Sequence, residues 1–313
     1  MPCVSVIIPA YNRAHVLRRA IRSVLSQTFT DYEIIIVDDA STDDTGAVAR
    51  NFDGPLRMIR HEVNRGPAAA RNTGINAAIG GYVAFLDSDD EWMPGKLARQ
   101  IELLDTSAKS FGASCSGYTV IHPEPGYSWE RRLPVGEKWT RYLLNNGCDL
   151  GPGSTLVARR VVFDRIGMFD ESLRRWEDWD WLLRYVADRE LAIVPEPQAV
   201  IYLSPPPPSD NVRAAIPRFL GRWQGELRQL GPTRYRRLRA RLCFELAMSL
   251  FHEGSRILGL LRVAQGLWSW PLQRPRAVRV VFDALFKTHF VLRATRRIAL
   301  SEIQSPLDSK KAP

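Results

Sequence analysis

The sequence predicts an α/β protein whose mostly parallel sheet is covered by helices on both faces. In the N-terminal third, continuous apolar strand patterns alternate with helical patterns, which is typical of a parallel sheet that is buried on both sides. Polar clusters also follow three of the predicted strands, as expected where ligands bind at the carboxyl ends of such a sheet. The 313 residues, 45% of them hydrophobic, suffice for a sizeable core.

The predicted elements follow from apolar periodicity and from breaking residues. Ser41–Asp44 offers capping side chains for a helix that runs through Arg50. The expected strands are 4–9, 33–37, 56–60, 82–86, 113–121 and 200–203. Besides that helix, the expected helices are 16–25, 66–79, 137–146, 159–166 and 176–188.

A run of four prolines, Pro205–Pro208, marks the predicted domain boundary, because proline joins neither helix nor sheet. Residues 1–205 carry 23 basic and 27 acidic side chains, and residues 206–313 carry 20 and 7. We therefore expect a domain over 1–205 that can hold cations and a basic, mainly helical region over 206–313. The basic region suits phosphates, an anionic membrane surface or a partner protein, and its helices could support a homodimer.

The compartment is predicted from what the sequence lacks. Its four cysteines form no CxxC pair and no disulfide pattern, which favours a reducing environment. The N-terminus has no basic region followed by a cleavage site, and no stretch reaches the roughly 20 apolar residues of a membrane span. We expect a cytoplasmic protein that meets the inner face of the membrane only peripherally.

Clustered carboxylates provide the strongest chemical signal. Asp87-Ser88-Asp89-Asp90 directly follows an apolar strand, and such a cluster suits Mg²⁺ or Mn²⁺, which prefer oxygen ligands. The alternative is a solvated turn that caps the next helix. Asp38-Asp39 follows another strand and could accept hydrogen bonds from a base or ribose, or could simply cap a helix.

Two further features combine charge with aromatic surface. Arg71, one turn into a predicted helix, could reach a phosphate or a base carbonyl, although an isolated arginine is more often a surface residue. Residues 176–181 place three tryptophans among three carboxylates. These rings could stack on sugars while a carboxylate acts as a general base, but a capped helix with core tryptophans is the plainer interpretation.

Taken in order, these motifs resemble the family-2 inverting glycosyltransferases, which have the GT-A fold. Five segments carry the resemblance. They are the strand 4–9 with Ala10-Tyr11-Asn12, the strand and acidic turn 33–43, the loop and helix start 64–72, the DxD-type motif Leu86–Asp90 and the acidic motif 176–180. It is specific as far as Asp90 and loose after Pro205.

The resemblance implies a metal-dependent transfer of a sugar from a nucleotide-sugar, with UDP as the usual nucleotide, to a hydroxyl of a glycan or lipid-linked acceptor. It implies a general base, Asp178, with Glu177 as the runner-up. The nucleotide-sugar would be bound by Pro9, Ala10, Tyr11, Asp39, Arg71, Asp87 and Ser88. Mn²⁺ or Mg²⁺ would be bound by Asp89 or Asp90. Trp176 and Trp179 would contact the sugar or the acceptor.

Other functions fit the sequence less well. A nucleotidyltransferase needs a glycine-rich basic loop after the first strand, and a dehydrogenase needs GxGxxG there. The chain instead has Ala10-Tyr11-Asn12-Arg13. The arginines at 234, 236, 237, 239 and 241 lack an accompanying nucleic-acid-binding motif, so no nucleic-acid partner is expected.

Overall fold

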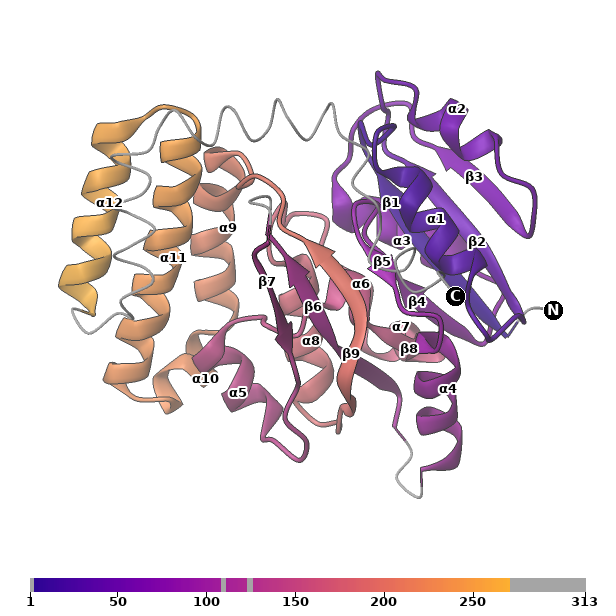
Figure 1. Cartoon of the computed structure of the whole chain (residues 1–313). Helices are drawn as coiled ribbons and strands as arrows, with labels where there is room; N and C mark the ends of the chain where they lie inside the picture. The colour runs from indigo at the N-terminus through magenta and orange to yellow at the C-terminus, as the bar shows by residue number, and fades with distance from the viewer. Residues whose placement is uncertain (1–2, 108–110, 123–125, 271–313) are drawn as a thin grey trace.

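The structure is a computed structural model that describes residues 3–107, 111–122 and 126–270. Its described strands form one nine-stranded sheet in the order β3-β2-β1-β4-β8-β6-β9-β5, with β7 paired to β6 (Figure 1). The strands are β1 (Val4–Ala10), β2 (Tyr32–Asp38), β3 (Leu56–Arg60), β4 (Tyr82–Phe85), β5 (Glu91–Trp92), β6 (Ala113–Ile121), β7 (Ser128–Arg131), β8 (Val157–Arg159) and β9 (Ala192–Tyr202).

The first half of the sheet is parallel and the second half is mixed. Strands β1 to β4 run parallel, as the sequence predicts, whereas β8 lies antiparallel between β4 and β6, and β5 lies antiparallel to β9. The GT-A-like α/β class is therefore confirmed: β6 and β9 also pair parallel, and each antiparallel pair of the described strands involves β5, β7 or β8. The extra antiparallel strands are two to four residues long.

Helices cover both faces of the sheet. The helices are α1 (Leu17–Leu25), α2 (Thr45–Arg50), α3 (Pro67–Ala77), α4 (Lys96–Thr106), α5 (Trp139–Asn146), α6 (Pro152–Thr155), α7 (Val161–Ile166), α8 (Glu177–Val186), α9 (Ser209–Arg222), α10 (Gln224–Gln229), α11 (Pro232–His252) and α12 (Arg256–Ser269). Side chains alternate along β1, so that Val6 and Ile8 face α1 and α4 while Ile7 faces α3. The approach of α3 is close, because a Cβ on Gly74 would lie 2.4 Å from Ile7.

The segment Ser41–Asp44 precedes a helix as predicted: α2 begins at Thr45, with Asp44 at its N-cap position, although the Asp44 side chain makes no capping bond. Other side chains of the segment bind the turn after β1: the backbone N–H of Asn12 donates to Ser41 Oγ, and that of Ala14 donates to Asp43 Oδ2. These bonds join the turn after β2 to the turn after β1.

The C-terminal helices share a hydrophobic core with the sheet. One continuous cluster of buried side chains extends from Ile7 and Phe85, through Trp181 on α8, to Phe219 on α9 and Leu246 on α11. In Figure 1 these helices stand at the end of the molecule opposite β1 to β3. The predicted boundary at residue 205 is thus followed by helices that pack on the same core, and the part of the region beyond Trp270 lies outside the described residues.

Candidate active site

The turns that follow β1, β2 and β4 meet at one edge of the sheet. Ala10 pairs with Asp38, and Ile7 pairs with Phe85, so the three strands end side by side. Asn12 and Ser41 are joined by a hydrogen bond of 2.9 Å. The structure therefore brings together the polar clusters that the sequence places at strand ends.

Backbone strain is concentrated at this edge. Among the described residues, the non-glycine residues with positive φ are Asn12, Ala40 and Trp176. Each costs on the order of 1 kcal/mol or more, and such residues cluster where a fixed geometry serves a site. Two of them lie in the turns after β1 and β2, and the third immediately precedes α8.

The side chains predicted to border a nucleobase differ in accessibility. Tyr11 is 44% exposed, whereas Ala10 is buried and Pro9 is partly buried. The Asp39 carboxylate is buried and accepts hydrogen bonds from His61 Nδ1 (2.7 Å) and from the backbone N–H groups of Arg65 (2.9 Å) and Gly66 (2.7 Å). Asp39 therefore fixes the loop that leads into α3.

The three carboxylates of the acidic turn occupy different environments. Asp90 is buried, and its two oxygens accept bonds from Ser154 Oγ (2.5 Å) and from the backbone N–H of Tyr202 (2.9 Å). Burial and the neighbouring acids raise its pKa well above the ordinary range. Asp90 is thus a structural part of the turn, and Ser88 between the acids is also buried.

Asp89 and Asp87 are the partly exposed acids of this turn, with 20% and 37% of their side chains accessible. Asp89 Oδ2 accepts a 2.5 Å hydrogen bond from Ser204 and lies 3.8 Å from Arg13 Nε. Of the two acids that the sequence leaves open as metal ligand, Asp89 is therefore the more accessible, because both oxygens of Asp90 are occupied by protein donors.

Arg71 joins the acidic turn to α8. Its guanidinium donates to Asp87 Oδ1 at 2.7 Å and to Glu177 Oε1 at 2.5 Å, and the side chain is almost completely buried. Burial alone would lower the pKa of Arg71, but the charges of Asp87 and Glu177 outweigh it and raise the pKa. Arg71 therefore bridges two carboxylates, and its contact with a base or phosphate stays a prediction.

The acid pair at the start of α8 is asymmetric. Glu177 is buried and accepts its hydrogen bond from Arg71. Asp178 is partly exposed, and Asp178 Oδ1 accepts a hydrogen bond from the backbone N–H of Trp179 (2.7 Å). Burial raises the pKa of Asp178, although the positive charges of Arg71 and Arg175 oppose the shift. Burial raises the pKa of Glu177 as well, so accessibility is what distinguishes Asp178 from it.

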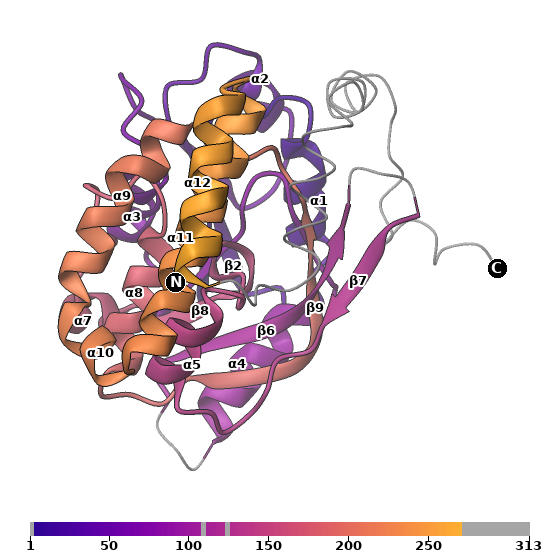
Figure 2. The same ribbon diagram turned by 90° about the vertical axis from the view of Figure 1, so that its left-hand side faces the viewer.

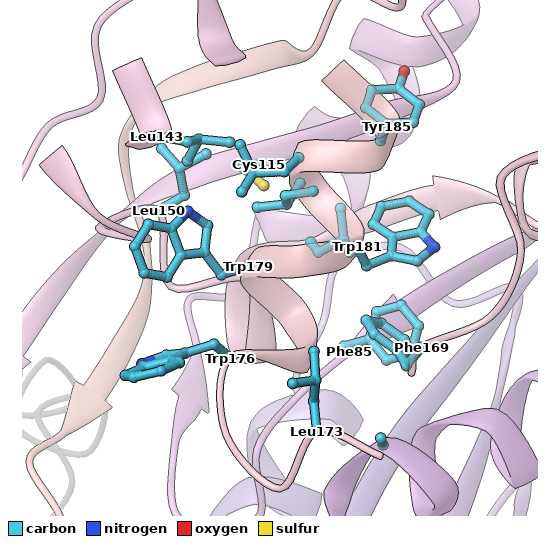
Figure 3. Close-up of a cluster of buried hydrophobic side chains, with 14 of the residues drawn as sticks. Phe85, Cys115, Leu143, Leu150, Phe169, Leu173, Trp176, Trp179, Trp181 and Tyr185 are labelled. Carbon is cyan, nitrogen blue, oxygen red and sulfur yellow. The ribbon is translucent and has the colours of Figure 1, made fainter. Parts of the chain in front are cut away.

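The tryptophans beside this pair belong to the core (Figure 3). Trp176 and Trp179 are only 5% and 2% exposed, and both pack on Phe219 of α9. Trp181 stacks on Phe163 with ring centroids 4.6 Å apart. The indoles of Trp176 and Trp179 thus offer almost no surface to a sugar, so burial argues against the predicted contact and favours the core interpretation.

The C-terminal helices hold α8 in place through polar contacts. Glu245 on α11 accepts hydrogen bonds from Arg175 Nε (2.6 Å) and Trp176 Nε1 (3.2 Å), the two residues that precede the acid pair. Arg222 and Trp223 donate to Asp180 at 2.8 and 3.1 Å. Side chains from the region after the proline run therefore hold the start of α8 in place.

Sequence reasoning missed several residues of this site. Ser154, on α6, accepts a hydrogen bond from the backbone N–H of Asp87 and donates one to Asp90, so it supports the acidic turn. Residues 151–154 are expected from the sequence to shape the acceptor site, not to hold the acidic turn, and Ser204, Arg13 and Glu245 belong to no motif of the sequence. The available signals were the position of Arg13 directly after Tyr11-Asn12 and the glycine-proline-glycine turn before Ser154, where a Cβ on Gly153 would lie 2.3 Å from Asp87 Oδ2.

Comparisons with known proteins find glycosyltransferases. An uncharacterized glycosyltransferase of Rickettsia prowazekii is 34% identical over 194 residues, which cover 59% of this chain and 58% of the relative. The Escherichia coli UDP-Glc:alpha-D-GlcNAc-diphosphoundecaprenol beta-1,3-glucosyltransferase WfgD is 40% identical over 160 residues, covering 51% of this chain and 61% of WfgD. The match thus spans about three fifths of these relatives.

The fold is also that of a solved structure. The crystal structure of Staphylococcus aureus TarS 1-349 in complex with UDP-GlcNAc superposes with a TM-score of 0.57 over 86% of this chain and 91% of that one, at 16% identity. The profile of one family, described as "Glycosyl transferase family 2", matches residues 5–167, which is more than half of the chain. The chain therefore belongs to glycosyl transferase family 2.

Proposed function

We propose that this chain transfers a sugar from a UDP-sugar to a hydroxyl of a glycan or lipid-linked acceptor, with inversion at the anomeric carbon. The observation that carries the proposal is the bridge of Arg71 between Asp87 and Glu177, which places the acidic turn beside the acid pair of α8. A donor bound at the turn would then have a carboxylate within reach of its anomeric carbon.

The donor class is supported by the relatives' names. WfgD is named for UDP-Glc and for an acceptor sugar on diphosphoundecaprenol, and the TarS crystal contains UDP-GlcNAc. In this chain the exposed ring of Tyr11 is available to stack on a uracil, with Pro9 and Ala10 beneath it. Asp39 would shape this pocket through the loop at Arg65 and Gly66.

The acidic turn fits a Mn²⁺ or Mg²⁺ ion. No group of three or more metal-ligating side chains that could hold an ion occurs among the described residues. A Mg²⁺ ion that is held by one or two carboxylates together with substrate phosphates does not need a larger group of protein ligands. Asp89, assisted by Asp87, would hold it, and the bound ion would supply charge compensation for the leaving diphosphate.

The protein's own part in the reaction is to move one proton. The acceptor oxygen forms a bond to the anomeric carbon while the bond from that carbon to the diphosphate oxygen breaks, and the bonding electron pair leaves with UDP. The acceptor's proton passes to Asp178, whose raised pKa makes it a better base than an ordinary aspartate. A single displacement needs no second nucleophile, and Glu177 holds Arg71 instead.

Binding of diphosphates tests the proposal. Calorimetric titrations with UDP, dTDP, GDP and CDP are run with Mn²⁺ and with EDTA. We expect UDP to bind most tightly and only with the metal, the D89N variant to lose this binding, and the D178N variant to keep it while losing sugar transfer. If a folded protein binds none of the four diphosphates, the proposed function is wrong.

A further inference from the structure

The last described helix, α12, has two apolar faces. Gly259, Val263 and Gly266 are buried against α11, where they contact the rings of Phe251 and Phe244. The opposite face is also apolar, with Ile257, Leu261 and Trp268 projecting from it. A helix of a soluble protein normally has one apolar face toward the core and one polar face toward water, so this second face calls for a partner.

This second face is a stripe at helical spacing. Ile257, Leu261 and Trp268 are 76%, 61% and 92% exposed, and Ala264 lies exposed between them. Because these positions follow i, i+4, i+7 and i+11, they form one line along the helix. Figures 1 and 2 show α12 as the outermost element at the end of the molecule, with α11 behind it. We name these four residues the α12 stripe.

The surroundings of the α12 stripe are basic. The helix α12 contains Arg256 and Arg262 and no acidic residue. The acidic residues of α11 and of the turn to α12 are both engaged with other parts of the fold: Glu245 with Arg175 and Glu253 with Ser209. The outer surface of this hairpin therefore presents apolar side chains flanked by arginines.

We propose that the α12 stripe is a membrane-contact surface that lies on anionic lipid. Apolar side chains with a tryptophan on one face and arginines at its borders are the composition of helices that lie in the interface of a bilayer. None of the described helices is both long and apolar enough to cross a membrane. The proposal rests on the proposed function for its purpose, because such contact would bring the site to a lipid-linked acceptor.

Charge favours lipid over the other occupants. A second copy pairing through the same stripe would bring Arg256 and Arg262 of both copies together, with no acid on α12 to offset them. Residues 271–313 of this chain carry nine basic and three acidic side chains, so they too would add positive charge to this surface. Anionic lipid headgroups, by contrast, gain attraction from every one of these charges.

Vesicle binding by the full chain tests the proposal without donor or acceptor. Co-sedimentation is measured with phosphatidylcholine vesicles with and without phosphatidylglycerol, for the wild type and for the variant I257S/L261S/W268S. The matched control is V63S/I79S/V161S, which replaces three exposed apolar side chains on other elements. A second variant, R256Q/R262Q, tests the charge contribution while leaving the stripe intact.

We expect the wild type and the control to bind anionic vesicles and the stripe variant to bind at least tenfold more weakly (~1.4 kcal/mol). R256Q/R262Q should bind less at low salt. Equal binding by the stripe variant overturns the proposal. The proposal is also overturned if the wild type binds no vesicles. A wild-type dimer that the stripe variant converts to monomer would then identify a second copy as the partner of the stripe. Shielding of Trp268 from iodide quenching would instead show that another part of the chain covers the stripe. UDP binding is measured separately, so failure of the membrane surface leaves the proposed transfer reaction standing.

Discussion

Arg71 donates to Glu177 across 2.5 Å although 106 residues separate them in the chain. The same guanidinium holds Asp87, so a single buried cation neutralises carboxylates from the acidic turn and from α8. Removing it would leave the buried Glu177 and the partly exposed Asp87 without their counter-charge, and an unpaired buried charge is strongly destabilising in proteins.

The R71M variant should therefore lose both stability and activity. We expect the free energy of unfolding to fall by about 3–5 kcal/mol and sugar transfer to fall at least 100-fold. R71K should retain part of the stability, because an ammonium keeps the charge without the two-pronged geometry. Urea unfolding and initial rates measure these effects. R65K, at an exposed ion pair with Glu171, is the control, and a similar loss there would contradict the argument.

The acid pair of α8 predicts two different phenotypes. D178N should lower kcat by roughly 10²–10⁴-fold, the range for loss of a general base, with the KM for the donor little changed. E177Q should mainly destabilise the fold, because it weakens the bond to Arg71. Steady-state kinetics and thermal unfolding separate the two. Should E177Q abolish turnover in a stable protein while D178N remains active, the roles are reversed.

Activity should depend on pH through the raised pKa of Asp178. Only the deprotonated carboxylate can accept the acceptor's proton, so kcat should rise with pH and level off above this pKa. Because burial raises the pKa, the midpoint should lie above the ordinary value for aspartate of about 4. The R175M variant removes a charge that opposes the shift and should move the midpoint to higher pH. A midpoint that stays in place in R175M argues against Asp178 as the titrating base.

Glu245 is expected to position the base from α11. Its carboxylate holds Arg175 and Trp176, and the latter has a positive φ. We expect E245Q to lower kcat by about tenfold, roughly 1.4 kcal/mol, with donor KM unchanged. E253Q is the matched control, since Glu253 binds Ser209 at the far end of α11. That variant should lose stability while keeping kcat, and equal kcat losses in both would indicate a purely structural role.

Lys96 predicts an unusual dependence of stability on pH. It is fully buried, its ammonium lies 4.1 Å from the centre of the Trp92 ring, and burial lowers its pKa to about 7. Between this value and about 10.4 the unfolded chain binds a proton that the folded chain does not. The contribution of Lys96 to stability therefore rises with pH across this window.

K96M should remove this dependence. At neutral pH the variant should be more stable than the wild type by roughly 1–4 kcal/mol, and the difference should shrink as the pH approaches 10. Urea denaturation at several pH values measures both. A difference that stays constant across the window would show that Lys96 is protonated in the folded protein.

Much of the fold could be predicted from local patterns. The strands 56–60 and 113–121 match β3 and β6 residue for residue. Strands β5, β7 and β8 were missed, since two to four residues carry no periodicity. Residues 157–159 form β8, so the helix predicted from residue 159 begins only at Val161.

The candidate site was predictable in position but not in detail. Strand ends indicated where Tyr11, Asp39 and Asp87–Asp90 would gather, because parallel strands end at a common edge. The partners of Arg71 and of Glu245 lie far away in sequence, and nothing local indicates which acid a buried arginine will meet. The tryptophans were ambiguous for a similar reason: their burial depends on α9, which follows some thirty residues later.

The core that runs from β1 through α8 to α11 also bears on how the chain can be recombined. Phe219 and Leu246 lie beyond the proline run, yet they belong to the same buried cluster as Ile7. Exchanging the part after residue 205 with that of a relative would therefore replace one side of a shared hydrophobic core. The buried side chains from the two sources would then have to repack against each other. A stable chimera would therefore need matched changes in the buried side chains on both sides of the prolines.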